Sequence, residues 1–431
     1  MMGGTAREIA FNLLLKAEAS KQYSNIVLDN ALQKSDLSTA DKNLTSILFY
    51  GVTERRITLD YQITTLSSRP IEDIDINTLT ALRIGLYQLI YLTRIPNHAA
   101  INESVSLVSK RSSGFVNALL RSFLRRGSLS LPKKQDTVAY LSVAYSIGRP
   151  LVEKFISIFG KDETELLLSA INDPAPTTLR INTLLTNRDL MLDKIPESAP
   201  TKNAPHGLWV KGSVRELYGF EEGMFFVQDE ASQICVEALG AQKNEFIMDI
   251  CACPGSKSFG AAINMQNNGR IMAFDLHENK LSLVTSSAKR LKIDIISTTA
   301  QDGRKPIEEL LGTADRIICD VPCSGFGVLS KKPELRYKSP SESAALPKIQ
   351  YDILENACRY LKVGGTLIYS TCTILPDENE NNISTFLSQH KEFSLEPWSV
   401  GDIVANNGMI TLFPHLHKTD GFFIAKLKRN Y

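Results

Sequence analysis

The sequence predicts a multi-domain protein in which an all-helical front part precedes a small α+β module and an α/β part with a doubly wound parallel sheet. Three observations predict this fold class. The chain has 431 residues, more than one ordinary domain contains. Residues 5–127 carry the apolar period of helices. From Glu245 onward, strand-like and helix-like segments alternate, which is typical of a parallel sheet with right-handed crossovers.

The front part, residues 1–128, is predicted to be helical because its apolar residues recur on one helical face. This period is clear in residues 9–17, 44–52 and 79–90. Asp75 stands where an N-cap would begin the last of these helices. The helical part is expected to end near Gly127.

The middle part, residues 129–232, is predicted to contain a linker and a small α+β module. Residues 129–134 resemble a linker, and residues 138–171 predict one or two short helices. Breaks are expected at Gly148, Pro150 and Gly160. The module is expected to hold a helix at 187–195 and strands at 177–182 and 208–210.

The last part, residues 233–431, is predicted to form the doubly wound sheet, with helices on both faces. In such sheets the ligand lies at the carboxyl ends of the strands, near the point where strand order reverses. The expected strands are 246–250, 270–274, 295–299, 316–319, 365–370 and 422–427, and the expected helices are 258–265, 278–291, 341–361 and 377–388.

Composition and charge narrow the function classes. The hydrophobic fraction of 43% and the charged fraction of 22% are ordinary for a soluble protein, and no stretch approaches the length of a membrane span. The N-terminus alternates apolar and charged residues like a helix rather than a signal peptide, so a cytoplasmic enzyme is expected. Net charge is only +1, yet residues 104–135 hold seven basic residues and no acidic one. That stretch suits a phosphate backbone, and an exposed helix end is the alternative interpretation.

Three acidic residues at strand ends indicate a cofactor site. Asp249 closes the first predicted strand, and the turn after it lets the backbone approach a ligand. Asp275 ends the second strand, where a carboxylate can accept hydrogen bonds from ribose hydroxyls, and Asp302 follows the third, placed to face an adenine. The turn lacks Gly-x-Gly-x-x-Gly, which favours a nucleoside without a pyrophosphate. Helix capping is the alternative role for these carboxylates.

Two cysteines follow neighbouring predicted strands, Cys323 after the fourth and Cys372 after the fifth. A zinc site is disfavoured because the cysteine spacings differ from C-x₂-C and no nearby histidine completes a ligand set. Core packing accounts for Cys235, Cys319 and Cys358, but not for two thiols in loops on the ligand face. All seven cysteines lie in the second half of the chain, which favours reduced thiols over structural disulfides.

A thiol beside a nucleoside cofactor predicts one reaction in particular. Carbon 5 of a pyrimidine is too weak a nucleophile to take a methyl group unaided. A thiolate that adds to carbon 6 makes carbon 5 nucleophilic, and later loss of the carbon-5 proton and of the thiol restores the ring. Asp320, directly after the fourth strand, could hold a proton against N3 of the ring as a general acid. The target base must leave its stack to be reached.

Three motifs resemble those of the RNA cytosine-5 methyltransferases, whose cofactor is S-adenosylmethionine. They are Asp-Ile-Cys-Ala-Cys-Pro-Gly-Ser-Lys at 249–257, Asp-Val-Pro-Cys-Ser-Gly at 320–325 and Ser-Thr-Cys-Thr at 370–373. Asp-Gly-Phe-Phe-Ile-Ala at 420–425 is similar to the family's final strand, and the helical front part resembles the NusB-like RNA-binding domain. Together these resemblances cover essentially the whole chain. They imply a Rossmann-like methyltransferase domain at residues 233–431.

The resemblance also implies roles for individual residues. Cys372 would be the nucleophile, Cys323 would assist release of the methylated base, and Asp320 would complete the catalytic set. The cofactor would contact Cys251, Ala252, Cys253, Pro254, Gly255, Ser256, Lys257, Asp275, Asp302 and Asp320. No metal is implied. The residue types alone do not show which of the two thiols is the nucleophile.

Two positions depart from the family pattern, because Cys253 and Ser256 stand where alanine and glycine are usual. Both residues are small, so the loop should tolerate them, although Ser256 is expected to need an unusual backbone angle. Lys331, Lys332 and Arg336, after the Cys323 loop, are predicted to meet RNA phosphates, with exposed surface charge as the alternative.

The resemblance therefore implies a cytoplasmic, monomeric enzyme that methylates carbon 5 of cytosine 967 in 16S rRNA with S-adenosylmethionine. The RNA would be free or part of an incompletely assembled small subunit. Two alternatives stay open: the same chemistry on tRNA or another rRNA site, and a NusB-like RNA-binding factor without catalysis. The pair of thiols disfavours the second alternative, since a binding module has no need of Cys372.

Overall fold

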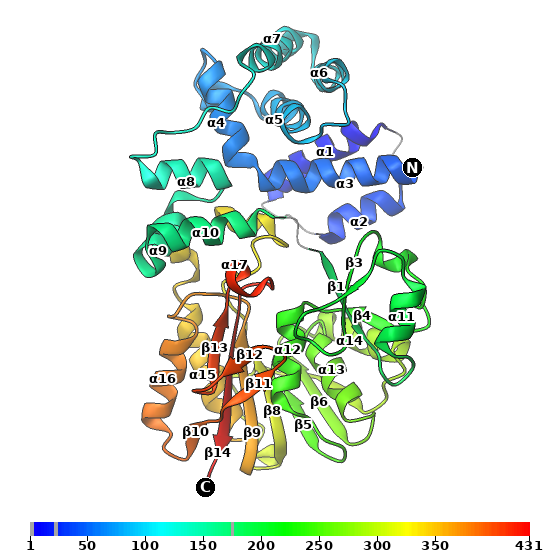
Figure 1. The fold of residues 1–431 in the computed structure, drawn as a ribbon, viewed down its shortest axis with the longest axis vertical. Helices are drawn as coiled ribbons and strands as arrows, with labels where there is room; N and C mark the ends of the chain where they lie inside the picture. The colour runs from blue at the N-terminus through cyan, green and yellow to red at the C-terminus, as the bar shows by residue number, and fades with distance from the viewer. Residues whose placement is uncertain (1–3, 21–24, 174–175) are drawn as a thin grey trace. The chain divides into compact units, whose positions relative to one another are not determined.

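The structure, a computed structural model, describes residues 4–20, 25–173 and 176–431 (Figure 1). The chain forms two compact units. The first comprises Met1–Asn172 together with Lys332–Pro340, and the second comprises Asp173–Lys331 together with Ser341–Tyr431. A nine-residue segment of the later chain is thus built into the helical unit. The boundaries at 128 and 232 stay predictions.

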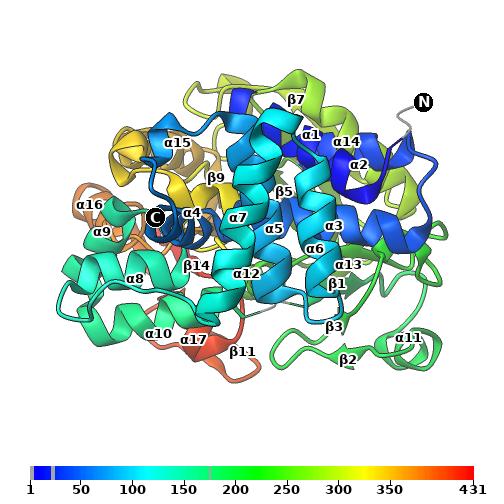
Figure 2. The ribbon, with the colours of Figure 1, turned by 90° about the horizontal axis from the view of Figure 1, so that it is seen from above.

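The first unit is helical, as expected. Its helices are α1 (Ala6–Ser20), α2 (Asn25–Gln33), α3 (Thr39–Glu54), α4 (Arg56–Leu66), α5 (Ile76–Tyr91), α6 (Asn97–Ser106), α7 (Lys110–Arg126), α8 (Thr137–Tyr145), α9 (Arg149–Phe159) and α10 (Lys161–Ile171), with 3₁₀ turns η1 (Ile71–Asp73) and η4 (Pro333–Tyr337). Helix α5 is the central element, since it packs against α1, α3, α4, α6 and α7 (Figure 2). Its N-cap is Asp75, whose side chain accepts a hydrogen bond from the Thr78 N–H, as predicted.

Residues 137–171 form three helices where the sequence predicted one or two. Gly148 and Gly160 lie at the helix boundaries, as expected. Pro150 does not break the chain, because it occupies the first turn of α9, where a missing N–H costs no intrahelical hydrogen bond. Gly127 ends α7 with a φ of +71°, which places the end of the preceding helices where the sequence predicted it.

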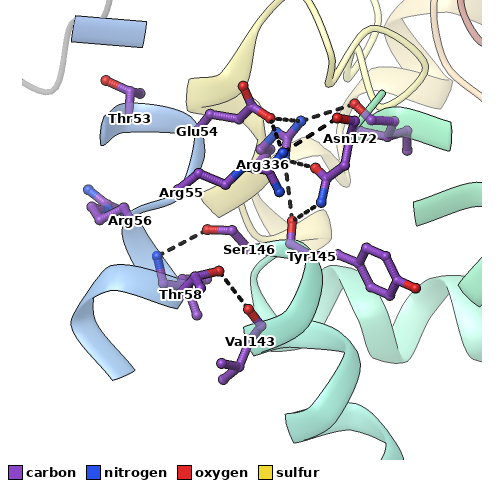
Figure 3. Close-up of polar contacts among 12 residues, drawn as sticks. Thr53, Glu54, Arg55, Arg56, Thr58, Val143, Tyr145, Ser146, Asn172 and Arg336 are labelled. Carbon is purple, nitrogen blue, oxygen red and sulfur yellow. Dashed lines mark hydrogen bonds and ion pairs between the residues drawn. The ribbon is translucent and has the colours of Figure 1, made fainter. Parts of the chain in front are cut away.

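Arg336 lies in the segment of the later chain that packs into the helical unit (Figure 3). Its side chain is 0% exposed and forms an ion pair with Glu54 at 3.3 Å. The guanidinium also donates to the Asn172 side chain at 2.5 Å and to the carbonyl oxygens of Ile171 and Tyr145 at 3.2 and 3.3 Å. The expectation that Arg336 meets RNA phosphates is therefore wrong, because its donors are used inside the protein.

The second unit is built on an eight-stranded sheet. The strand order is β10-β14-β9-β8-β5-β6-β7, with β13 also paired to β14. The strands are β5 (Phe246–Asp249), β6 (Arg270–Asp275), β7 (Ile296–Ala300), β8 (Ala314–Asp320), β9 (Leu361–Thr371), β10 (Phe393–Leu395), β13 (Met409–Leu412) and β14 (Phe422–Arg429). Strands β5 to β9 are parallel, but β14 is antiparallel to β9, β10 and β13. The sheet is therefore mixed, which corrects the expectation of a wholly parallel one.

Helices cover both faces of this sheet, as predicted. The covering helices are α12 (Glu230–Leu239), α13 (Ser256–Asn264), α14 (Glu278–Arg290), α15 (Leu346–Cys358) and α16 (Glu380–Gln389). This part of the chain also contains the short helix α17 (Pro414–His417) and the 3₁₀ turns η2 (Val214–Glu216), η3 (Glu308–Leu310) and η5 (Pro340–Ser343). Ile247 of β5 packs in the core that includes α12, α13 and α14, whereas its neighbour Met248 packs in the core that includes α15 and α16. The helix expected at 341–361 is shorter, because Pro347 is confined to the first turn of α15.

A second, four-stranded antiparallel sheet precedes the large one in the chain. Its order is β2-β3-β1-β4, with β1 (Thr177–Ile181), β2 (Ala199–Pro200), β3 (Gly207–Val210) and β4 (Phe225–Val227). Helix α11 (Arg188–Lys194) begins after the N-cap Asn187 and completes the small α+β module that the sequence predicted. A separate ribbon pairs β11 (Trp398–Val400) with β12 (Ile403–Ala405).

Candidate active site

The predicted site residues lie at the carboxyl ends of β5, β6, β8 and β9 and in the turns that follow them. Strand β5 pairs with β6 on one side and with β8 on the other, so strand order reverses at β5. The reversal leaves Asp249 and Asp320 at the ends of two adjacent parallel strands. This edge is where doubly wound sheets bind ligands.

The turn after β5 is shaped for close approach to a ligand. Gly255 has a φ of +108°, and a Cβ atom added there would lie 2.4 Å from the Phe259 ring, so only glycine fits. Ser256 is the first residue of α13 and is not among the residues with positive φ. The expectation of an unusual backbone angle at Ser256 is therefore wrong, because the left-handed position falls one residue earlier.

Asp249 presents a buried carboxylate to this turn. Its side-chain oxygen Oδ2 accepts a hydrogen bond from Ser258 Oγ at 2.6 Å. Its other oxygen, Oδ1, is buried without a hydrogen-bond partner among the described residues. A buried acceptor with unused capacity is rare and fits a ligand that carries a donor. The sequence identified Asp249 as a strand end, but it could not show that one of its oxygens lacks a protein partner.

The buried carboxyl of Asp249 predicts a pH-dependent stability. Burial raises its pKa from the ordinary 3.8 to about 7. Between these values the native protein holds a proton that the unfolded chain has lost, so stability falls as pH rises through this window. We expect the free energy of unfolding of the protein, minus that of Asp249→Asn, to fall by up to about 4 kcal/mol from about pH 4 to about pH 7. Urea unfolding without cofactor measures this difference.

Ser258→Ala serves as the control for this prediction. The hydrogen bond donated by the Ser258 hydroxyl is the largest of the effects that lower the pKa of Asp249, so its removal should extend the window to higher pH. If the difference in free energy of unfolding between the unmodified protein and Asp249→Asn stays constant from about pH 4 to about pH 7, the raised pKa assigned to Asp249 is wrong.

Asp275 and Asp302 lie beyond the same edge of the sheet, with different partners. Asp275 accepts hydrogen bonds from the backbone N–H groups of Cys253 at 3.3 Å and His277 at 2.9 Å, so it ties the cofactor turn to the end of β6. Asp302 is paired with Arg304 through two side-chain contacts of 2.9 and 2.8 Å. The hydrogen bond from Arg304 lowers the pKa of Asp302. Contacts of either carboxylate with a cofactor stay predictions.

Lys257 links the cofactor turn to the end of β8. Its ammonium lies 2.6 Å from Asp320 Oδ2, and Ser370 Oγ donates to Asp320 Oδ1 at 2.7 Å. The Lys257 side chain is only 8% exposed. Although burial alone lowers the pKa of Lys257, the Asp320 carboxylate outweighs this effect and raises it. Lys257 therefore keeps its proton at neutral pH, and the pair joins two predicted site residues across adjacent elements.

The structure brings the two predicted thiols together. Strands β8 and β9 are parallel neighbours, with Asp320 opposite Ser370, so the turns that follow them leave the sheet side by side. Cys323 Sγ lies 3.2 Å from Cys372 Sγ, and the Cys372 backbone N–H donates to Cys323 Sγ at 3.3 Å. Both residues are half-buried, whereas Cys235, Cys319 and Cys358 are buried in the core, as predicted.

The environment of Cys323 favours its protonated form. The hydrogen bond with Cys372 raises the pKa of the Cys323 thiol, burial raises it further, and so do the charges of Cys372 and Glu378. Cys323 therefore holds a proton at neutral pH and is poorly suited to attack a carbon atom unaided. The contact and the burial that cause this shift depend on segments remote in the sequence, so they could not be read from the motif around Cys323.

The basic residues expected to face RNA differ in their exposure and in their protein partners. Lys331 is half-exposed and lies 2.6 Å from Asp229 and 2.8 Å from Asp420, so its charge is largely balanced by protein carboxylates. Lys332 is exposed. The basic stretch of the helical unit is confirmed as accessible at four residues of α7, namely Lys110, Arg111, Arg121 and Arg125.

Across residues 4–20, 25–173 and 176–431, no group of three or more His, Cys, Asp or Glu side chains is arranged to hold a metal ion. Over those same ranges, no helix combines the length and the apolar character needed to cross a membrane.

Two family models match the chain in separate regions. The model of the 16S rRNA methyltransferase RsmB/F matches residues 236–428, which include every predicted site residue. The model of the NusB family matches residues 4–125, which lie in the helical unit. The two matches correspond to the two regions in which the sequence resembled known proteins.

Known proteins resemble the chain over nearly its full length. A Bacillus subtilis (strain 168) protein named "Probable ribosomal RNA small subunit methyltransferase B" is 34% identical and covers 99% of each chain. A Synechocystis protein of the same name is 37% identical, again with 99% of each chain covered. Among solved structures, that of PH0851 has a TM-score of 0.80 and 26% identity over 99% of each chain.

Proposed function

The chain belongs to the ribosomal RNA small subunit methyltransferase B family, and from this membership we propose that it methylates carbon 5 of a cytosine in 16S rRNA through a covalent bond to Cys372. It is an rRNA methyltransferase that depends on S-adenosylmethionine. The observation that carries the proposal is the 3.2 Å contact between Cys372 Sγ and Cys323 Sγ beside the Lys257–Asp320 pair.

Cytosine needs covalent activation because its carbon 5 is a weak nucleophile. In the proposed reaction the Cys372 thiolate adds to carbon 6, and the electron pair moves through carbon 5 as that atom takes the methyl group. A base such as a solvent water molecule then removes the carbon-5 proton, and the electron pair of that C–H bond expels the thiolate and restores the ring. S-adenosylmethionine supplies an electrophilic methyl group when bound. The bond between Cys372 Sγ and carbon 6 is thus formed once and broken once in each turnover.

Asp320, Lys257 and Cys323 would support this reaction. The Asp320 carboxylate, paired with the Lys257 ammonium, would stabilise a proton that N3 of the base takes up as negative charge develops there. Cys323, which the site keeps protonated, would assist release of the methylated base rather than attack it. The target base must be extruded from its stack to lie between these groups.

The cofactor would bind at the turn formed by Cys251–Lys257 and would also contact Asp275, Asp302 and Asp320. Two features support this placement: the unpartnered buried oxygen of Asp249 and the glycine-only position at Gly255. The accessible basic residues of α7 support contact between the helical unit and RNA phosphates. We propose cytosine 967 as the target, in free 16S rRNA or an incompletely assembled subunit, and a monomer as the active form.

Mapping of 5-methylcytosine in rRNA tests the proposal. In cells that lack this protein, bisulfite sequencing should show one 16S rRNA cytosine that has lost its methyl group, and the intact gene should restore it. The gene carrying Cys372→Ala should not. Unchanged 16S rRNA with a methyl group missing from tRNA would favour the alternative substrate. Unchanged methylation of all RNA would contradict the proposed function.

A further inference from the structure

Glu378 is a buried carboxylate between the turns that carry the two thiols. It follows β9 in the loop between Cys372 and α16, and it is 2% exposed. A carboxylate removed from water in this way requires strong hydrogen-bond donors to compensate for lost solvation. Its partners therefore reveal what it holds in place.

The partners of Glu378 belong to the Cys323 turn and to α15. Its oxygen Oε2 accepts from the Ser324 backbone N–H at 2.9 Å and from Gln350 Nε2 at 2.7 Å. Its other oxygen, Oε1, accepts from Ser324 Oγ at 2.5 Å. Gln350 Nε2 also donates to the Pro322 carbonyl at 3.0 Å. The residues on both sides of Cys323 are thus held by one carboxylate and its amide partner.

The backbone of Glu378 is fixed to the other turn. Its carbonyl accepts a hydrogen bond from the Tyr369 hydroxyl at 2.7 Å, within β9. The next residue, Asn379, accepts from Thr371 Oγ1 at 2.6 Å and donates to the Thr373 carbonyl at 3.0 Å. Thr371 and Thr373 flank Cys372. Glu378 therefore connects the chain on both sides of one thiol to the chain on both sides of the other.

We propose that Glu378 is a positioning residue that holds the Cys323 turn against the Cys372 turn and so keeps the two sulfur atoms in contact. It acts through Ser324 and Gln350, which donate hydrogen bonds to its carboxylate. Its effect on turnover rests on the proposed function, in which Cys323 assists release from Cys372. Its effect on the geometry of the thiols does not.

Glu378→Gln tests the effect on turnover in the full-length protein. The variant loses the charge and one acceptor, so the Cys323 turn should loosen while the cofactor turn stays intact. We expect kcat for RNA methylation to fall about 10- to 100-fold, with a covalent enzyme–RNA species accumulating and with KM for RNA nearly unchanged. A purely structural role would lower the melting temperature and the active fraction without accumulation of the adduct.

Glu380→Gln is the matched control. Glu380 is a carboxylate two residues further along, and it accepts a hydrogen bond from Thr411 Oγ1 at 2.6 Å, away from both thiol turns. Its variant should show the kcat and adduct level of the unmodified protein. Ser324→Ala keeps the charge of Glu378 but loses its hydroxyl donor and the contact of that hydroxyl with Thr373 Oγ1 at 2.8 Å, so it should show the same effect even where Glu378→Gln folds poorly. Wild-type adduct levels and kcat in both Glu378→Gln and Ser324→Ala would overturn the proposal.

Binding of phenylarsine oxide tests the geometry without RNA or cofactor. This arsenical condenses with two thiols to form two As–S bonds and releases one water molecule, with no change in oxidation state. A pair of sulfurs already in contact binds it more tightly than a loose pair, because less freedom is lost. At pH 7 we expect affinity to fall about tenfold in Glu378→Gln and to be lost from this site in Cys372→Ser. Unchanged affinity in Glu378→Gln would overturn the positioning role.

The two tests separate the two proposals. Weakened arsenical binding in Glu378→Gln, combined with no covalent RNA species in any variant, would support the positioning role and contradict the covalent mechanism. Unchanged arsenical binding, combined with a trapped RNA species in Cys323→Ala, would support the mechanism and overturn the role of Glu378.

Discussion

Replacing Cys372 with alanine is expected to abolish RNA methylation and to prevent any covalent enzyme–RNA species from forming. Without the sulfur no bond to carbon 6 is made, so carbon 5 stays unreactive toward the methyl group. The remaining binding and electrostatic effects of the site do not replace a nucleophile, and we expect a loss of at least about 10⁴-fold in kcat/KM. Transfer of tritium from labelled S-adenosylmethionine to 16S rRNA measures the loss.

Cys358→Ala is the control for this substitution. Cys358 ends α15 and is buried in the core, where its thiol donates to the Glu355 carbonyl at 3.1 Å. Its variant should retain activity and be slightly less stable, because a small apolar group has been removed. Cofactor affinity in Cys372→Ala should also be unchanged, since the proposed cofactor turn is a separate segment. An RNA adduct that persists in Cys372→Ala would show that another group is the nucleophile.

Replacing Cys323 with alanine is expected to have the opposite effect on the adduct. Attack by Cys372 remains possible, but release of the methylated base loses the protonated thiol that lies 3.2 Å away. We expect turnover to fall about 10²- to 10⁴-fold while a covalent enzyme–RNA species accumulates. A denaturing gel of the reaction with labelled RNA would show this species as a band of reduced mobility.

The double variant Cys323→Ala with Cys372→Ala is the control for the trapped species. It should form no adduct, because the only proposed nucleophile is absent. If Cys323→Ala forms no adduct and Cys372→Ala forms one, the roles of the two thiols are exchanged. That outcome would leave the covalent reaction in place and would contradict only the assignment of its steps.

Local sequence patterns predicted most of the elements that build the site. The alternation of apolar segments placed β5, β6, β8 and β9 correctly to within a few residues, and it made β8 and β9 neighbours. These patterns report burial and periodicity, which each segment carries by itself. They do not report strand direction, which depends on the path of the connecting chain. The strand expected at 422–427 is present as β14, but its antiparallel direction was missed for that reason.

The exposure of charged side chains was harder to predict. A charged residue is expected at the surface unless the partner that would balance its charge in the interior is known. Arg336 was expected at an RNA surface, yet its ion pair with Glu54 and its carbonyl partners come from segments distant in the sequence. Lys331 was assigned to RNA for the same reason and pairs with Asp229 and Asp420. Burial of a charge is decided by these long-range partners, which no local pattern contains.

The sequence alone determined the class of chemistry, since the cofactor turn, the strand-end aspartates and the two thiols are local motifs with definite chemical properties. Only the tertiary structure decided how they are arranged. It placed the sulfurs of Cys323 and Cys372 in contact, paired Lys257 with Asp320, and joined both thiol turns through Glu378. The physical reason is that residue type fixes what a group can do, whereas reactivity depends on distances and desolvation that only packing of remote segments creates.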